Sequence, residues 1–324
     1  MKILGMGNAL VDVLAKLDAD DTLTALDLAK GSMQLIDVER RNHIFSRIQH
    51  LPQEMTAGGC ASNTLAALAK LGLHVGFVGK AGNDAYGKFY LQDLDTIGVH
   101  THIIQEQAAS GTAMVLISPG GERTFGTYLG VSAELSAADL SEDVFRPYSY
   151  FYIEGYLVQN PELITSAIKM AKRLGMKVVI DAASYNVVEA NKDFFQQMID
   201  EYVDIVFANE EEAKALTGLE NPQDAIRRIA EKTEIAVVKI GAKGALAMRG
   251  DELVNVPAIQ TTVVDTTAAG DYYAAGFIYG LSKNLSLTQC AQSGALLAAH
   301  IIAVVGTRLN DYSWQQIKQE LLKY

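Results

Sequence analysis

Short runs of β-branched and aromatic residues alternate with helical patterns along most of this chain. The strand-like runs occupy 75–78, 150–153, 177–180, 205–207 and 235–238, and the helical patterns include 161–174, 210–216 and 222–232. Because a crossover between parallel strands usually contains a helix, this alternation predicts an α/β fold with a mostly parallel sheet and helices on both faces. The strand-like runs are almost continuously apolar, which is typical of strands buried on both faces.

The composition suits a folded protein of this class. The chain has 324 residues, and 49% of them are hydrophobic, which is enough for one large domain or two. The formal net charge of −11 argues against a nucleic-acid partner. No apolar run reaches membrane-spanning length, and Met1 leads directly into a strand-like run, so we expect no membrane partner and no signal peptide. Cys60 and Cys290 are far apart in the sequence, which argues against a disulfide framework and predicts a cytoplasmic location.

The segment with the clearest chemistry is 264–276, VDTTAAGDYYAAG. A turn of small residues leads there into an apolar helix. The first N–H groups of a helix lack internal partners and lie at the positive end of its dipole, so this turn suits an anion such as phosphate. Asp271 would repel a phosphate, but it can take a proton from a hydroxyl that attacks one. The alternative is an Asp that only caps the helix.

A second segment, 57–72, reads AGGCASNTLAALAKLG. Gly58 and Gly59 allow the backbone to approach a ligand closely, and apolar residues then recur at helical spacing. Asn63 falls in the first turn, within reach of a bound hydroxyl. Together the two segments resemble the signature motifs of the ribokinase-like (PfkB-type) family of carbohydrate and nucleoside kinases. The usual second signature, D-T-x-G-A-G-D, is DTTAAGD at 265–271 in this chain, and the resemblance extends over nearly its whole length.

The resemblance implies a three-layer α/β/α fold with a mostly parallel central sheet and a small β-sheet lid over the substrate site. It implies a core at 1–9, 37–107 and 130–324 and a lid at 10–36 and 108–129. A lid suits phosphoryl transfer because it keeps water away from the reactive phosphate. From the residues alone, the two lid ranges are equally compatible with ordinary surface hairpins.

The resemblance also implies a phosphotransferase that uses ATP and Mg²⁺ and acts on an alcohol group. Asp271 would be its general base, and the backbone of Ala268, Ala269 and Gly270 would stabilise the transferring phosphoryl group. Ala268 stands where the family usually has glycine. If this residue has a positive φ, alanine costs about 1 kcal/mol there.

Other motifs extend the site by the same resemblance. The residues implied in substrate binding are Asp12, Gly58, Gly59 and Asn63, and Asp12 is suited to accept hydrogen bonds from vicinal hydroxyls. The residues implied in nucleotide binding are Lys239, Gly241, Gly244 and Thr266. The N-x-x-E motif implies that Asn209 and Glu212 hold magnesium, largely through its waters. A candidate site for a monovalent cation such as K⁺ falls at Asp265 and Thr267.

Several short phrases resemble the adenosine kinase-like branch of the family, at 7–12, 30–33, 121–124, 154–156 and 271–277. They imply transfer of the γ-phosphate of ATP to the 5′-hydroxyl of a nucleoside such as adenosine, with Phe125 and Tyr128 as candidates for stacking on the base. One alternative is a sugar kinase acting on ribose, fructose or a keto-deoxy sugar acid, whose carboxylate Arg123 could bind. Another is a non-catalytic sensor of nucleoside or ATP. Exposed lid edges leave both a monomer and a homodimer open.

Overall fold

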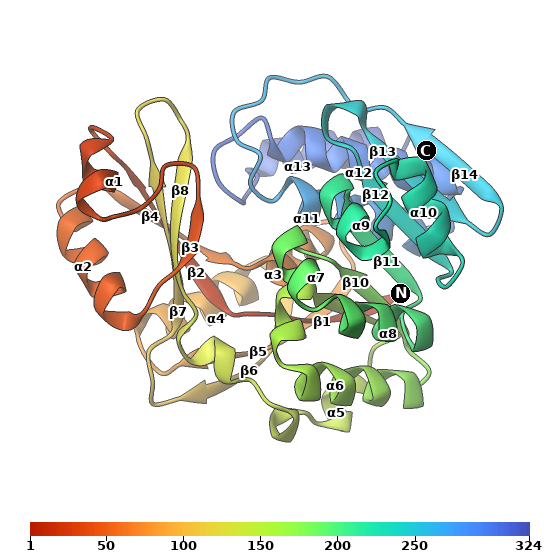
Figure 1. The fold of residues 1–324 in the computed structure, drawn as a ribbon, viewed down its shortest axis with the longest axis horizontal. Coiled ribbons are helices and arrows are strands. Elements are labelled where there is room, and N and C mark those ends of the chain that lie inside the picture. Colours follow the sequence, from red (N-terminus) through yellow and green to blue (C-terminus); the bar gives the residue numbers. More distant parts are fainter.

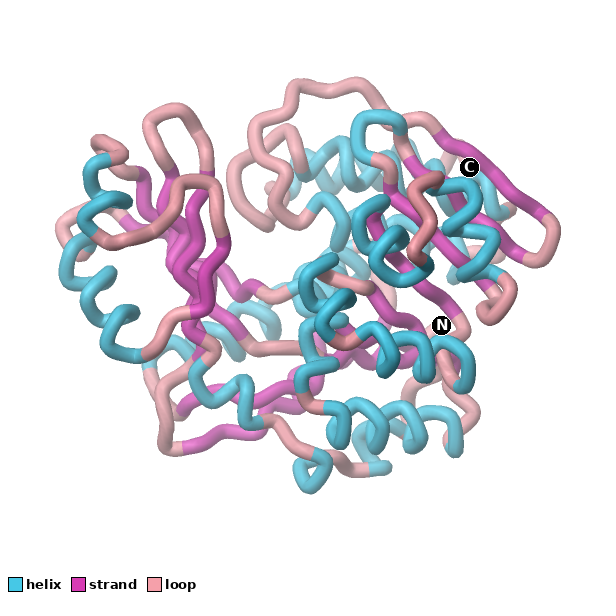
Figure 2. The backbone as a smooth tube through the Cα atoms, in the orientation of Figure 1, coloured by secondary structure: helices cyan, strands magenta, loops and turns pink.

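The computed structural model describes residues 1–324, and its backbone is organised by two sheets (Figures 1 and 2). The larger sheet has nine strands, in the order β14 (Glu252–Val256), β13 (Ala245–Arg249), β12 (Ile235–Lys239), β11 (Ile205–Asn209), β10 (Lys177–Asp181), β9 (Tyr150–Glu154), β1 (Lys2–Met6), β5 (His74–Gly82) and β6 (Val99–Glu106). Only the pairs β12–β13 and β13–β14 are antiparallel. The predicted α/β class with a mostly parallel central sheet is therefore confirmed.

Helices cover both faces of this sheet, as the three-layer prediction requires. One layer contains α3 (Cys60–Lys70), α4 (Ala85–Ile97), α11 (Ala269–Ser282), α12 (Leu287–Ile301) and α13 (Asp311–Leu321). The other contains α5 (Glu142–Phe145), α6 (Pro161–Arg173), α7 (Tyr185–Ala190), α8 (Lys192–Glu201), α9 (Glu210–Thr217) and α10 (Pro222–Ala230). No helix is both long enough and apolar enough to cross a lipid bilayer.

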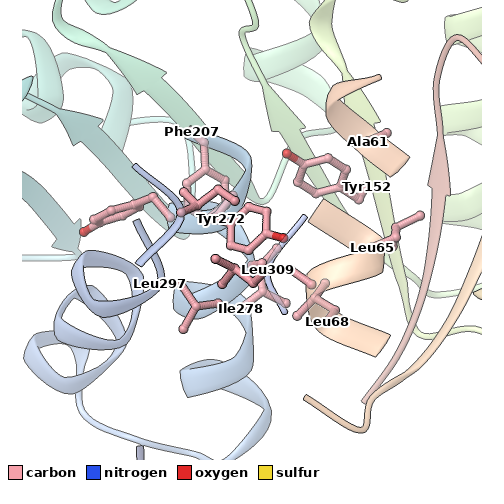
Figure 3. Packing of buried hydrophobic residues seen from close by; sticks show 14 of the residues in the cluster. Ala61, Leu65, Leu68, Tyr152, Phe207, Tyr272, Ile278, Leu297 and Leu309 are labelled. Atoms are coloured by element: carbon pink, nitrogen blue, oxygen red, sulfur yellow. The ribbon is translucent and has the colours of Figure 1, made fainter. Parts of the chain in front are cut away.

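Alternate side chains of the central strands enter two separate hydrophobic cores. On β9, Tyr152 belongs to the core that contains α3 and α11, whereas Phe151 and Ile153 belong to the opposite core. This division follows from the two-residue repeat of a strand. Figure 3 shows part of the first core, where Leu68 of α3 lies near Tyr272 and Ile278 of α11, and the two helices are in contact. The packing matters because both helices carry predicted site residues in their first turns.

The smaller sheet stands beside the core at the left of Figure 1. Its strands are β3 (Met33–Leu35), β8 (Arg123–Tyr128), β7 (Gly111–Ile117), β2 (Leu10–Lys16) and β4 (Gln53–Gly58), in that order, and α1 (Asp21–Ala25) and α2 (Val38–Ile48) lie in the chain between β2 and β4. Residues 37–107 were predicted to belong to the core, but β4 pairs antiparallel with β2 and so belongs to the smaller sheet. This strand could not be recognised from the sequence because β4 is an edge strand with exposed polar residues and no run of β-branched ones.

Candidate active site

Polar side chains gather where neighbouring parallel strands of the larger sheet end. Glu154, Asp181, Asn209 and Lys239 are the last residues of β9, β10, β11 and β12. The carboxyl ends of parallel strands meet at one edge of a sheet, which is where ligands bind in open α/β sheets. Asn209 and Lys239 were predicted site residues, whereas Glu154 and Asp181 were not singled out by the sequence analysis.

The anion turn, which we define as residues 265–270, leads into α11 at the same edge. Asp265 accepts hydrogen bonds from the N–H of Thr267 at 3.0 Å and of Gly306 at 2.8 Å, which fixes the start of the turn. Ala268 is the residue before α11 and has a φ of 60°, in the left-handed region. Its backbone therefore has the conformation that glycine adopts more readily, so alanine is strained there.

Asp271 lies in the first turn of α11 and is almost fully buried, with 7% of its surface exposed. Its Oδ2 accepts a hydrogen bond of 3.0 Å from Nδ2 of Asn63, on α3. Burial raises the pKa of Asp271 to about 7, although the hydrogen bond from Asn63 opposes this change. A carboxyl group with this pKa can accept and release a proton near neutral pH.

Asp12, on β2, faces the end of β4. A Cβ on Gly58 would overlap its carboxylate, so only glycine leaves room for this approach. Gly59 follows with a φ of 94°, and a Cβ there would lie 2.6 Å from the carbonyl oxygen of Asn8. Burial raises the pKa of Asp12 to about 7, against the charges of Arg308 and Arg123. The structure thus brings Asp12 together with Gly58 and Gly59, as predicted.

Glu154 connects the segment after β1 to the first turn of α3. Its carboxylate accepts hydrogen bonds from the backbone N–H of Asn8 at 2.7 Å, from Nδ2 of Asn8 at 2.9 Å and from the N–H of Ala61 at 3.1 Å. It is 1% exposed, and burial raises its pKa although the three donors oppose this. Its signals in the sequence are an acid at the end of an apolar strand and its place in the phrase at 154–156.

Lys239 lies behind the anion turn. Its Nζ is 3.1 Å from Oδ2 of Asp181 and 3.0 Å from the point where a Cβ on Gly270 would lie. Gly241 and Gly244 form the predicted tight turn after β12, both with positive φ, and Thr266 is exposed. Lys239 therefore contacts the anion turn, although the sequence motif grouped it with the glycine turn that follows β12.

Asn209 and Glu212 form a reciprocal cap at the start of α9. Glu212 accepts hydrogen bonds from the backbone N–H of Asn209 at 2.8 Å and from its Nδ2 at 2.7 Å. In return its own N–H donates to Oδ1 of Asn209 at 2.8 Å. Burial raises the pKa of Glu212 to about 7, against the charge of Lys239. The structure brings the two residues of the motif together, as their spacing predicts.

Arg123 joins the smaller sheet to the anion turn. Its Nη2 is 2.6 Å from Oδ2 of Asp265, and its Nη1 donates to Oγ1 of Thr267 at 3.3 Å. Both residues of the candidate cation site therefore contact a guanidinium in this structure. The side chains of Arg123 and Asp265 are 8% and 5% exposed, so water screens this ion pair little.

A cavity of about 390 Å³ lies between the two sheets, beside Gly59 and Cys60. Eleven of its 18 lining residues are hydrophobic, and none is Lys, Arg or His. The smaller sheet contributes Leu10, Met33, Leu35 and Thr127 to the lining. The stacking candidates Phe125 and Tyr128 are not among these residues. Phe125 packs on apolar residues of its own sheet, and the ring of Tyr128 lies 5.4 Å from the guanidinium of Arg41.

Comparisons with known proteins identify the family and agree with the fold. The sequence model of the pfkB family of carbohydrate kinases matches residues 28–314. A probable sugar kinase from Rhizobium etli CFN 42 has a similar structure, with a TM-score of 0.89 and 33% identity over 98% of both chains. An adenosine kinase from Sinorhizobium meliloti has the same TM-score and identity, over 98% of this chain and 99% of its own. An uncharacterized sugar kinase from Archaeoglobus fulgidus is 29% identical over 74% of this chain and 96% of its own length.

Proposed function

Because the chain belongs to the pfkB family of carbohydrate kinases, we propose that it transfers the γ-phosphate of ATP to the 5′-hydroxyl of a nucleoside such as adenosine. The broader activity, phosphoryl transfer to a hydroxyl group, follows from the family. The relatives leave the acceptor open, since a probable sugar kinase and an adenosine kinase are equally similar in sequence and structure. The choice of acceptor therefore rests on the site of this chain.

The observation that carries the proposal is the cavity beside Gly59. Its size and largely apolar lining suit a planar, uncharged group attached to the sugar, such as a nucleobase. A keto-deoxy sugar acid would need a cation for its carboxylate, and the lining offers none. The acidic residue in the lining, Glu154, is occupied by three N–H donors. These properties favour a nucleoside over a sugar acid.

We propose that Asp271 takes the proton of the 5′-hydroxyl as its oxygen bonds to the γ-phosphorus. The bond between the γ-phosphorus and the bridging oxygen to the β-phosphate then breaks, which leaves ADP and a nucleoside 5′-phosphate. Free N–H groups of the anion turn would stabilise negative charge on the transferring group, with Lys239 behind them. Asp12 would accept hydrogen bonds from the ribose hydroxyls beside Gly58 and Gly59.

Magnesium fits beside Asn209 and Glu212. Each carboxylate oxygen of Glu212 accepts one hydrogen bond from Asn209, so lone pairs remain for the waters that magnesium retains. We propose that these residues hold Mg²⁺ through water, where the bound ion would neutralise charge on the ATP phosphates.

A monovalent cation such as K⁺ beside Asp265 and Thr267 stays a prediction. Because Arg123 contacts both residues, we expect the cation to raise turnover only if it displaces the guanidinium of Arg123 from them. Turnover in potassium chloride, compared with the same concentration of tetramethylammonium chloride, measures the dependence.

The test is ATP turnover with magnesium and a panel of adenosine, inosine, guanosine, ribose, fructose and 2-keto-3-deoxygluconate. We expect turnover with a nucleoside, and a loss of about 10³-fold in Asp271→Asn because a general base contributes about 10²- to 10⁴-fold. Asp251→Asn, in an exposed turn, is the matched control. Turnover with sugars alone would replace the proposal by the sugar kinase alternative. Binding of ATP and nucleoside without turnover would replace it by the sensor.

A further inference from the structure

A hydrogen-bond relay reaches Asp271 from Arg308, a residue to which the proposed mechanism gives no role. Arg308 lies in the segment between α12 and α13, and its Nη1 donates to Oδ1 of Asn63 at 2.9 Å. Asn63 then donates from Nδ2 to Oδ2 of Asp271 at 3.0 Å. An amide has an acceptor end and a donor end, so a guanidinium on its oxygen fixes which end faces the carboxylate.

Arg308 is itself held by its neighbour Thr307 and by groups from distant parts of the chain. Its Nη1 donates to the carbonyl oxygen of Thr307 at 3.1 Å, and its Nη2 donates to the carbonyl oxygen of Ala57, at the end of β4. Nη2 is also 3.7 Å from Asp93, on α4, and Asp93 accepts a hydrogen bond of 3.0 Å from the N–H of Ala57. The planar guanidinium is thus fixed in orientation before it meets Asn63.

We propose that Arg308 is a positioning residue for phosphoryl transfer, holding the Asn63 amide so that its N–H end directs the Asp271 carboxylate at the acceptor hydroxyl. This inference rests on the proposed role of Asp271 as the base. Asn63 is only 4% exposed, so few other partners can fix its amide. Without the guanidinium, the amide can turn and present its oxygen to the carboxylate, which repels it.

The charged groups that surround Asp271 help to distinguish an effect of Arg308 through hydrogen bonds from an effect of its charge. Some ionisable groups change the pKa of Asp271 by their charge, and others have their own pKa changed by the charge of Asp271. These groups are Asp181, Lys239, Glu154, Cys60, Tyr152, Tyr156 and Tyr272. The charge of Arg308 lowers the pKa of Asp12, Tyr90 and Tyr272 against the effect of burial. The hydrogen bonds connect Arg308 to Asp271 through Asn63, and a lysine in place of Arg308 would keep the charge but lose the paired contacts to Asn63 and to the carbonyl oxygen of Ala57.

The test is a double-mutant cycle on kcat and on the KM of the acceptor. We expect Arg308→Met and Asn63→Ala each to lower kcat about 10- to 100-fold, because misorientation of a catalytic group slows the chemical step, and Arg308→Met to change KM less than about threefold. The double variant should be no slower than the slower single variant. Arg308→Lys should resemble Arg308→Met, and Lys70→Ala, which removes an exposed ion pair with Asp311, should leave kcat unchanged.

Two kinetic results would overturn the relay. If the losses of kcat from the two substitutions multiply in the double variant, or if KM rises at unchanged kcat, Arg308 acts on the substrate independently of Asn63. Full kcat in Arg308→Lys would mean that only the positive charge matters.

A second measurement does not depend on turnover. Carbon-13 NMR of the Asp271 carboxyl in the unliganded protein follows its titration, and Arg308→Lys should titrate at higher pH than the wild type because the Asn63 donor is lost. An unchanged titration rejects the relay. A shifted titration in a protein that phosphorylates no nucleoside supports the relay and rejects only the proposed acceptor. Thermal melting of each variant identifies any that fails to fold. If Arg308→Met fails to fold, the test is made with Arg308→Lys, which keeps the charge.

Discussion

The Nζ of Lys239 lies 3.0 Å from the point where a Cβ on Gly270 would be, so the ammonium and the anion turn are in contact. The Asp181 carboxylate, 3.1 Å from the same nitrogen, holds it there. A positive charge behind N–H groups that face a phosphate adds to their electrostatic effect, and a buried site screens it little.

Gly270→Ala tests this contact. The new methyl group would push the ammonium away, and because a lysine end is flexible, the fold should be retained. We expect kcat to fall about three- to tenfold, as for the weakening of one electrostatic contact to the transferring group. Steady-state kinetics measure it, and Gly120→Ala, where a Cβ would meet nothing within 4 Å, is the control. Equal kcat in both variants would remove Lys239 from the mechanism.

Ala268→Gly should make the protein more stable. Because Ala268 has a φ of 60°, glycine relieves up to about 1 kcal/mol of strain there. Thermal melting should show a rise of about 2 °C. Ala298→Gly, inside α12, is the matched change in ordinary helical backbone and should lower the melting temperature instead. A fall in both variants would mean that the left-handed turn suits alanine.

Asp271→Asn should stabilise the unliganded protein at alkaline pH. Burial raises the pKa of Asp271 from 3.8 to about 7, so the stability that its protonated form contributes is fully present below the unfolded pKa and is lost as the pH rises through about 7. Asparagine carries no charge and can still accept the hydrogen bond from Asn63. The melting temperature of the variant should exceed that of the wild type by a margin that widens from pH 4 to 7 and then stays constant. A margin independent of pH would contradict the raised pKa.

The histidines at the β5–β6 edge should make the protein sensitive to acid. The rings of His74 and His100 have centroids 4.8 Å apart, and burial lowers the pKa of His74, with the charge of His100 adding to the effect. Folded His74 thus binds a proton less readily than the unfolded chain does. Its contribution to stability is present above a pH of about 6.5 and is lost as the pH falls below that value.

His74→Phe keeps an aromatic ring and removes this titration. We expect urea unfolding of the variant to change less between pH 7 and pH 5 than that of the wild type. The exposed His50, replaced by asparagine, controls for removing a histidine elsewhere. If His74→Phe loses as much stability in acid as the wild type, protonation at this edge is not the cause.

The fold could be predicted from the sequence where local patterns agree with the tertiary structure. The helical patterns at 161–174 and 222–232 became α6 and α10 because proline, fixed at a helical φ, starts each helix and an apolar face continues it. The strand at 150–153 was recognisable because burial on both faces makes it apolar throughout. The strand β4 carries neither signal, and its pairing with β2 depends on a partner about 40 residues away.

The candidate site was predictable only where motifs marked it. The two glycine-containing turns indicated Asn63 and Asp271, but not that they are bonded to each other. Arg308 has no local signal, since its partners Asn63, Ala57 and Asp93 lie far from it in sequence. Glu154 resembles, in sequence, an ordinary polar residue at the end of a strand. The contacts of these residues depend on how distant segments come together in the fold. The periodicity and spacing of the sequence do not indicate this arrangement.

Because the pKa of both Asp12 and Asp271 is raised to about 7, protonation of these two carboxyl groups should compete with binding of the proposed acceptor. At neutral pH each carboxyl is protonated in a large fraction of the molecules, whereas the proposed roles of Asp12 in holding the acceptor and of Asp271 in deprotonating it need both ionised. Binding must then release protons to the solvent, so the heat measured by calorimetry would depend on the ionisation enthalpy of the buffer. Turnover should therefore fall as the solution becomes more acidic than about pH 7, without any dedicated inhibitor.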